Sequence, residues 1–89
     1  MSAIEEIQNE RRRQVDVEGY TSESDDKYTN NELARAAHCY VDPLVSEVAP
    51  PFWPWSSKWW NPKSYRENLI RAGALIVAEI DRIDRIEKK

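Results

Sequence analysis

Apolar residues recur at helical spacing in three stretches of the chain, and each stretch follows the same capping pattern. In this pattern a hydroxyl residue is followed three positions later by glutamate, so that each side chain can bond a backbone N–H group of the other residue. The pattern occurs at Ser2 and Glu5, at Thr29 and Glu32, and at Ser64 and Glu67. It predicts helices over about 3–17, 30–41 and 65–87, the first followed by Gly19 as a C-terminal cap.

The first two predicted helices differ in their apolar faces. The helix over 3–17 has a thin stripe, formed by Ile4, Ile7 and Val15. Arg11 lies on the same stripe, so it is expected to point inward, toward a carboxylate or a bound anion. The helix over 30–41 has an apolar face rich in alanine, which favours close packing against a neighbour; the face consists of Leu33, Ala36, Ala37 and Tyr40.

The helix over 65–87 is the longest and is predicted to be central. Its first half is apolar nearly all round, as in a helix that is covered on several sides. Gly73 costs about 1 kcal/mol relative to alanine in a helix, so a neighbouring element is expected to approach its backbone closely. The main apolar stripe comprises Leu69, Ala72, Ile76, Ile80 and Ile83.

Two non-helical segments connect the predicted helices. Residues 20–28 are polar and acidic, and residues 44–63 are rich in proline and tryptophan (PPFWPWSSKWWNP). The second segment is long for a connection in a compact domain, which indicates packing or function. The predicted fold is a single all-α domain, residues 1–89, of three helices with an ordered Trp/Pro-rich connector packed across them.

Composition narrows the class of partner. A net charge of −3, from 13 basic and 16 acidic residues, lacks the basic excess that a general nucleic-acid binder needs. A chain of 89 residues can bury only a small core, which favours a homo-oligomer. Cys39 is the only cysteine, which excludes an internal disulfide, and no apolar run approaches the ~20 residues of a membrane span. We therefore expect a cytoplasmic protein in a reducing compartment.

The main candidate binding residues are four tryptophans of the connector: Trp53, Trp55, Trp59 and Trp60. They can roof a small core, or one or two of them can line a pocket or an interface, where exposed indoles are effective anchors. Further candidates are Tyr20, Arg11, Arg12 and Arg13. If the ligand is a nucleotide, an indole would stack on its base while arginines hold its phosphates. If it is a protein, the indoles would anchor the interface.

No catalytic constellation is recognisable from residue types and spacing. His38, the only histidine, adjoins Cys39, and neighbouring helical residues point in different directions, so the two do not form a dyad. Neither a metal site nor a cofactor is predicted. Under the alternative of a Mg²⁺-dependent nucleotide hydrolase, the metal would be held by Glu18, Asp25, Asp26 and Glu32.

Six motifs follow one another along the chain: Glu10-Arg11-Arg12-Arg13-Gln14, Glu18-Gly19-Tyr20, Glu23-Ser24-Asp25-Asp26, Glu32-Leu33-Ala34-Arg35-Ala36-Ala37, Pro50 to Trp55 and Asn68 to Arg85. In this order they resemble a group of small accessory proteins encoded by tailed phages and prophages. The resemblance covers nearly the whole chain, and its most specific parts are the Pro-Pro-x-Trp-Pro-Trp stretch and residues 69–76. The chain departs from the group at Tyr20, which is more often Trp, and at Asn31, which is more often Gly.

The resemblance implies a non-catalytic phage accessory protein that antagonises a host defence in the bacterial cytoplasm, by occluding a host protein or sequestering a nucleotide signal. A second resemblance, in the last helix, is to MazG-like all-α nucleotide pyrophosphohydrolases, which hold Mg²⁺ with an ExxE pair and a later ExxD pair. Here Asn9 follows Glu6 and Arg82 follows Glu79, so that pattern is broken. A structural or assembly component of a phage is a third alternative.

Overall fold

The computed structural model describes residues 1–87, and the secondary structure within that range is helical. The elements in chain order are α1 (Ala3–Asp16), α2 (Ser22–Asp25), α3 (Glu32–Val41), the 3-10 turn η1 (Ser57–Trp59) and α4 (Tyr65–Glu87). The predicted all-α class is confirmed, with two short elements more than expected, α2 and η1. The short helix α2 lies in the segment expected to be a polar loop, where the Thr21 hydroxyl caps it by accepting a hydrogen bond from the Ser24 N–H at 3.2 Å.

The three predicted helix starts differ in outcome. At α1 both bonds of the capping box between Ser2 and Glu5 form. At α4 the Ser64 hydroxyl accepts from the Glu67 N–H at 3.1 Å. The predicted helix is present at α3, but its predicted cap at Thr29 was wrong: the helix begins at Glu32, after Asn31 in the left-handed region (φ 64°), and the Glu32 carboxylate accepts from the Asn30 N–H at 2.7 Å. A left-handed turn directly before the helix replaces the expected cap.

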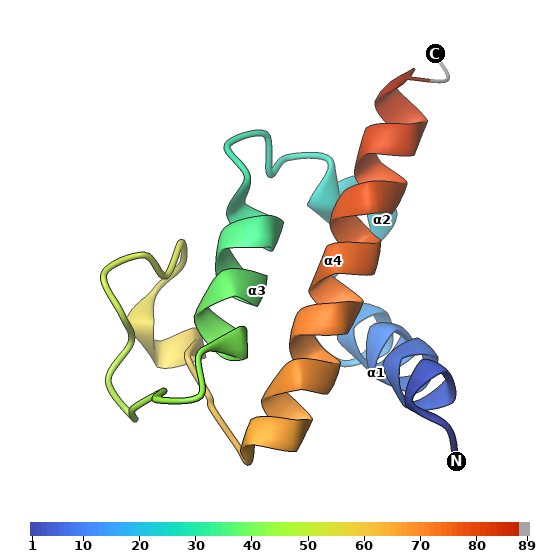
Figure 1. Ribbon diagram of the computed structural model, residues 1–89. Helices are drawn as coiled ribbons and strands as arrows, with labels where there is room; N and C mark the ends of the chain where they lie inside the picture. Colours follow the sequence, from blue (N-terminus) through green and yellow to red (C-terminus); the bar gives the residue numbers. More distant parts are fainter. Residues whose placement is uncertain (88–89) are drawn as a thin grey trace.

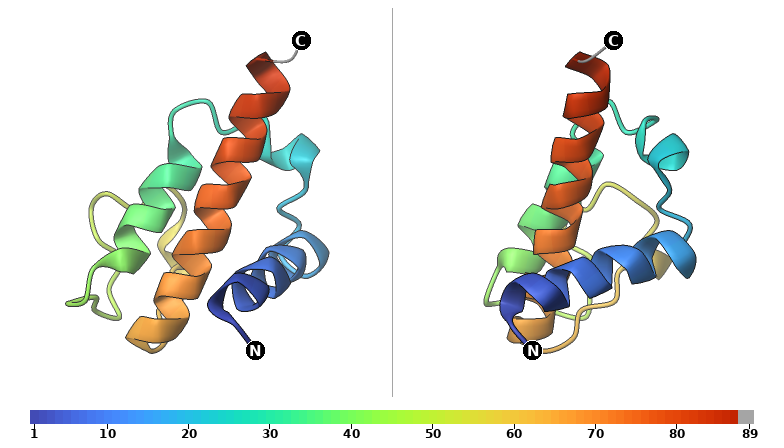
Figure 2. Two further views of the ribbon diagram at one scale, coloured as in Figure 1. Left: turned by 45° about the vertical axis from the view of Figure 1, so that its right-hand side comes forward. Right: turned by 90° about the vertical axis from the view of Figure 1, so that its right-hand side faces the viewer.

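Helix α4 is central, as predicted, because the other three helices contact it. Helix α3 runs along one side of α4, while α1 crosses its first half and α2 lies beside its second half (Figures 1 and 2). Gly73 marks the crossing with α1: a Cβ atom there would lie 2.9 Å from Ile7 Cδ1. The predicted close approach to Gly73 is therefore confirmed.

The core lies between α3 and α4. The predicted apolar face of α3 is buried in full, and α4 meets it with two alanines and one leucine. Small side chains on both helices allow their backbones to approach closely. The α4 residues of this core are Ala72, Leu75 and Ala78.

The predicted isoleucine stripe of α4 does not face this core. Ala72 is buried, but Leu69, Ile76, Ile80 and Ile83 are 38–52% exposed. The alanine face fits against α3 more closely than the bulkier β-branched face can, so the isoleucines point to solvent. Within residues 1–87, no helix is long and apolar enough to cross a membrane.

The Trp/Pro-rich connector is ordered against the helices. It leaves the end of α3, loops past that helix and returns to the start of α4 (Figure 1). Trp60 stacks on Tyr40 of α3 with ring centroids 4.8 Å apart, and Trp53 meets the same ring edge-on at 5.6 Å. Both indole N–H groups donate to backbone oxygens within the connector, Trp53 to Ser56 at 3.1 Å and Trp60 to Ser46 at 2.9 Å. These two tryptophans are therefore part of the core.

Candidate functional site: an aromatic pocket

A pocket of about 360 Å³ opens between the end of α1, the helix α2 and the connector. In the right-hand view of Figure 2 the connector reaches toward the end of α1. Four aromatic side chains and one carboxylate dominate the lining, and small residues complete it. The lining residues are Glu18, Gly19, Tyr20, Ser24, Tyr28, Trp55, Ser56 and Trp59.

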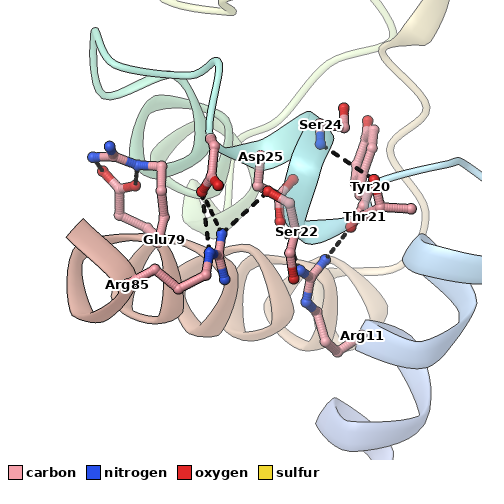
Figure 3. A network of polar contacts seen from close by, with 10 residues as sticks. Arg11, Tyr20, Thr21, Ser22, Ser24, Asp25, Glu79 and Arg85 are labelled. Carbon is pink, nitrogen blue, oxygen red and sulfur yellow. Dashed lines mark hydrogen bonds and ion pairs between the residues drawn. The ribbon is translucent and has the colours of Figure 1, made fainter. Parts of the chain in front are cut away.

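The turn after α1 delivers Tyr20 to the pocket. Gly19 has a φ of 77°, which a residue with a side chain adopts only with strain, and this turns the chain sharply. The Tyr20 N–H then donates to the Gln14 carbonyl at 2.9 Å, and the Tyr20 carbonyl accepts from the Arg11 guanidinium at 3.0 Å. Arg11 points inward as predicted, and it holds one wall of the pocket in place (Figure 3).

The same arginine fixes α2, which carries the next wall. Arg11 forms an ion pair of 2.6 Å with Asp25, whose side chain is fully buried. Burial raises the pKa of Asp25, and the Arg11 guanidinium opposes this increase. The Tyr28 N–H donates to the Asp25 carbonyl at 3.0 Å, so the position of Asp25 also sets that of Tyr28.

A second arginine joins α2 to the central helix. Arg85 of α4 forms an ion pair of 2.7 Å with Asp26 and donates to the Ser22 carbonyl at 3.3 Å (Figure 3). A helix of four residues, such as α2, is not stable in isolation. The contacts with α1 and α4 therefore stabilise it.

Trp55 forms the inner wall of the pocket. Its ring centroid lies 5.6 Å from that of Tyr20 and 5.3 Å from that of Tyr28, in tilted arrangements. Its indole Nε1 is buried and has no hydrogen-bond partner within residues 1–87. A buried donor without a partner costs about 1–3 kcal/mol, so this indole is less well satisfied than those of the core. Burial also raises the pKa of the Tyr20 hydroxyl, which keeps that wall uncharged.

Trp59 and Glu18 form the outer part of the pocket. Trp59 ends η1, where its N–H donates to the Ser56 carbonyl at 3.0 Å, and its side chain is 60% exposed. The Lys58 ammonium lies 5.4 Å from the centre of the Trp59 ring, within the range of a cation–π interaction. Glu18 is partly exposed and forms an ion pair with Arg13 at 3.4 Å.

The structure divides the candidate binding residues into two groups. Tyr20, Trp55 and Trp59 line the pocket, whereas Trp53 and Trp60 are buried in the core. Tyr28 was missed by sequence reasoning. The sequence offered one indication: Tyr28 is an aromatic residue at the end of an otherwise polar, acidic segment, which favours packing of that segment against the connector.

The three arginines predicted to hold an anion do not converge. Arg11 is engaged with Asp25, and Arg13 bonds Glu10 through two nitrogens, at 2.7 and 2.8 Å, while Arg12 is exposed. Arg13 also lines a groove between α1 and α4. In this groove Arg66 likewise pairs with a carboxylate, that of Glu6. The guanidinium groups beside the pocket are thus neutralised within the chain.

The carboxylates of the hydrolase alternative are likewise dispersed. Asp25 and Asp26 pair with different arginines, Glu18 pairs with Arg13, and Glu32 accepts a hydrogen bond from the Asn30 N–H. Within the described range 1–87, no group of three or more His, Cys, Asp or Glu residues is placed to hold a metal ion.

Comparisons of the chain with protein-family models, with curated proteins and with solved structures give no match.

Proposed function

We propose that the protein acts by non-catalytic binding and that the aromatic pocket receives the group it recognises. The observation that carries this proposal is the pair of indoles left outside the core. Trp59 is 60% exposed, and Trp55 Nε1 has no hydrogen-bond partner within the described residues. A ligand that covers Trp59 would remove its apolar surface from water, which is the usual role of such aromatics at binding sites.

The chemistry of the lining favours a positively charged group. Aromatic faces attract cations, most strongly those of Trp, and Glu18, which also pairs with Arg13, places a carboxylate at the opening. Lys58 above Trp59 shows this attraction within the chain itself. A phosphate would meet Glu18 and find no unpaired guanidinium in the lining. Of the two ligand classes considered from sequence, a side chain of a partner protein therefore fits better than a nucleotide.

In the phage setting that the sequence resemblance implies, the partner would be a host protein in the bacterial cytoplasm. Occlusion of that protein would account for an effect on host defence without turnover. Such a role needs a rigid recognition surface and no catalytic group, which agrees with the way Arg11 and Arg85 anchor the short helix α2.

A titration with choline tests the proposal, because its trimethylammonium group is a compact organic cation. Tryptophan fluorescence should show saturable binding of choline, at least fivefold tighter than that of its uncharged carbon analogue 3,3-dimethylbutan-1-ol, which corresponds to about 1 kcal/mol. Trp59→Ala should abolish the response. The matched control is Phe52→Ala, because Phe52 is an exposed aromatic of the same connector outside the pocket.

Two results would contradict the proposal. ATP or a cyclic nucleotide that binds more tightly than choline, with the same loss in Trp59→Ala, would assign the pocket to nucleotides. Release of pyrophosphate or phosphate from nucleoside triphosphates with Mg²⁺ by the pure protein would replace binding with hydrolysis. Either result is measured on the same preparation.

A further inference from the structure

The exposed stripe of α4 is an apolar feature that the aromatic pocket does not involve. In Figure 1 no element crosses in front of α4. Four exposed aliphatic residues lie along one seam of α4, and a glycine and a glutamate complete the alternating spacing of four and three residues that marks a coiled coil. The seam positions are Leu69, Gly73, Ile76, Ile80, Ile83 and Glu87.

The area of this stripe is comparable with that of the largest apolar patch on a typical monomer, which is often functional. From their exposed fractions, Leu69, Ile76, Val77, Ile80 and Ile83 leave on the order of 400 Å² of aliphatic surface on one helix face. With the polar rim that usually surrounds such a core, each copy would bury about 600 Å². Two copies would then bury about 1,200 Å², the lower end of specific interfaces.

The shape of the molecule also leaves this face of α4 without a covering layer. The molecule measures 39 × 33 × 20 Å, so in its thinnest direction it is a slab about two helices thick. Its accessible surface of 5906 Å² exceeds the roughly 5,400 Å² typical of a compact monomer of 10.5 kDa. A second copy of the slab would cover the bare face of α4.

The seam is self-complementary in one antiparallel register. If Ile76 of one copy faces Ile80 of the other, Leu69 faces Glu87 and Gly73 faces Ile83, so each seam position meets another seam position. Ile7 already fills the space beside Gly73, where a Cβ atom would lie 2.9 Å from Ile7 Cδ1, so Ile83 of the second copy would rest on the Ile7 side chain.

The helix dipoles favour the same direction, because an antiparallel pair places the N-terminus of each α4 beside the C-terminus of the other. Charged side chains do not decide the direction: Arg66 at the beginning of the seam pairs with Glu6 of its own chain, and Glu87 at the other end is followed in the sequence by Lys88 and Lys89.

We propose that a second copy of this chain covers the exposed stripe of α4, forming an antiparallel α4–α4 homodimer about a twofold axis between Ile76 and Ile80. The small interface makes the dimer one of micromolar affinity. The aromatic pocket lies on a different set of residues, so this proposal stands independently of the ligand.

Sedimentation equilibrium of the full chain between 5 and 500 μM, roughly spanning the affinity of small interfaces, tests the assembly. The mass should rise from 10.5 kDa toward twice that value. Ile80→Glu, at a site 52% exposed in the single chain, should keep the fold by circular dichroism and weaken dimerisation at least tenfold. The matched control is Leu44→Glu, an exposed apolar residue outside the stripe, which should dimerise like the wild type.

Cysteine pairing tests the orientation. An oxidised mixture of Leu69→Cys and Glu87→Cys should give the mixed disulfide dimer, while neither variant alone should couple to itself. The native Cys39 is buried and does not interfere. A wild-type mass that stays at one chain up to 500 μM, or Ile80→Glu dimerising like the wild type, would overturn the proposal. Self-coupling of Leu69→Cys would overturn the antiparallel register.

Discussion

Two pairs of tryptophans lie within eight residues of the connector, and the structure uses them in opposite ways. Trp53 and Trp60 are buried against Tyr40, and each indole N–H donates to a backbone oxygen. Trp55 and Trp59 line a pocket, one with an unpaired Nε1 and the other 60% exposed. The difference shows that a tryptophan contributes fully to stability only where both its apolar ring and its N–H group are satisfied. Under the proposed function, Trp55 and Trp59 are the pair that contacts the ligand.

The sharpest test of this division is truncation of an inner tryptophan. Trp60→Ala removes the stacked ring against Tyr40 and the bond to Ser46, and leaves a cavity in the core. We expect a loss of about 3–5 kcal/mol in the free energy of unfolding. Urea denaturation followed by circular dichroism measures it. A loss below 1 kcal/mol would mean that Trp60 does not belong to the core.

The next largest effect is expected where the pocket is anchored. Arg11→Ala leaves the buried Asp25 carboxylate without its ion-pair partner and frees the Tyr20 carbonyl. The expected destabilisation is about 2–3 kcal/mol, lower than for a fully buried pair because Arg11 is partly exposed. The same denaturation experiment measures it.

Arg12→Ala is the control for that substitution, because Arg12 is exposed on the same helix. It should change the free energy of unfolding by less than about 0.5 kcal/mol.

The Arg11→Ala variant should also bind choline more weakly, at a temperature where it remains folded, because the Tyr20 carbonyl loses its anchor. Equal losses in both arginine variants would contradict the role of Arg11.

Alkaline pH should act on both regions, because burial raises the pKa of Tyr20 in the pocket and of Tyr40 in the core. The unfolded chain releases these protons near pH 10, before the folded chain does. The stability that the neutral hydroxyls contribute is therefore complete below pH 10. It is lost as the pH rises through the higher pKa values of the folded state.

Thermal midpoints measured between pH 8 and pH 11.5 check this expectation, with tyrosinate absorbance recorded in parallel. Tyr20→Phe should be less sensitive to alkali than the wild type. It removes one of the two hydroxyls and makes no change to the core ring. An unchanged alkaline slope in Tyr20→Phe would show that Tyr20 titrates as in water.

The smallest stability effect is expected at the outer tryptophan. Trp59→Ala removes a ring that is mostly exposed, so the free energy of unfolding should fall by less than about 1 kcal/mol. Side by side with Trp60→Ala, this substitution at a neighbouring position separates the two roles. Similar losses in the two variants would abolish the distinction between core and pocket.

Much of the framework could be predicted from local patterns. The helix over 65–87, the box at Ser2 and Glu5, and the buried face of α3 depend on residues a few positions apart, and the structure confirms them. The position of Gly73 likewise predicted a close neighbour, which is Ile7. Such features depend on helical periodicity and backbone capping, which a single sequence displays directly.

The sequence-based predictions were wrong where local preferences did not distinguish between alternative arrangements. Two faces of α4 are apolar, and only packing against α3 selects the alanine face and leaves the isoleucines exposed. Asn31 adopts a left-handed turn that moves the start of α3 to Glu32.

The sequence by itself determined a capped all-α framework with an aromatic connector held against it. Tertiary structure decided which two indoles enter the core, that Arg11 meets Asp25, and that Tyr28 joins the pocket. The physical reason is that these choices depend on contacts between residues distant in the chain. Neighbouring tryptophans are chemically identical until such contacts satisfy the N–H group of one and leave that of the other unpaired.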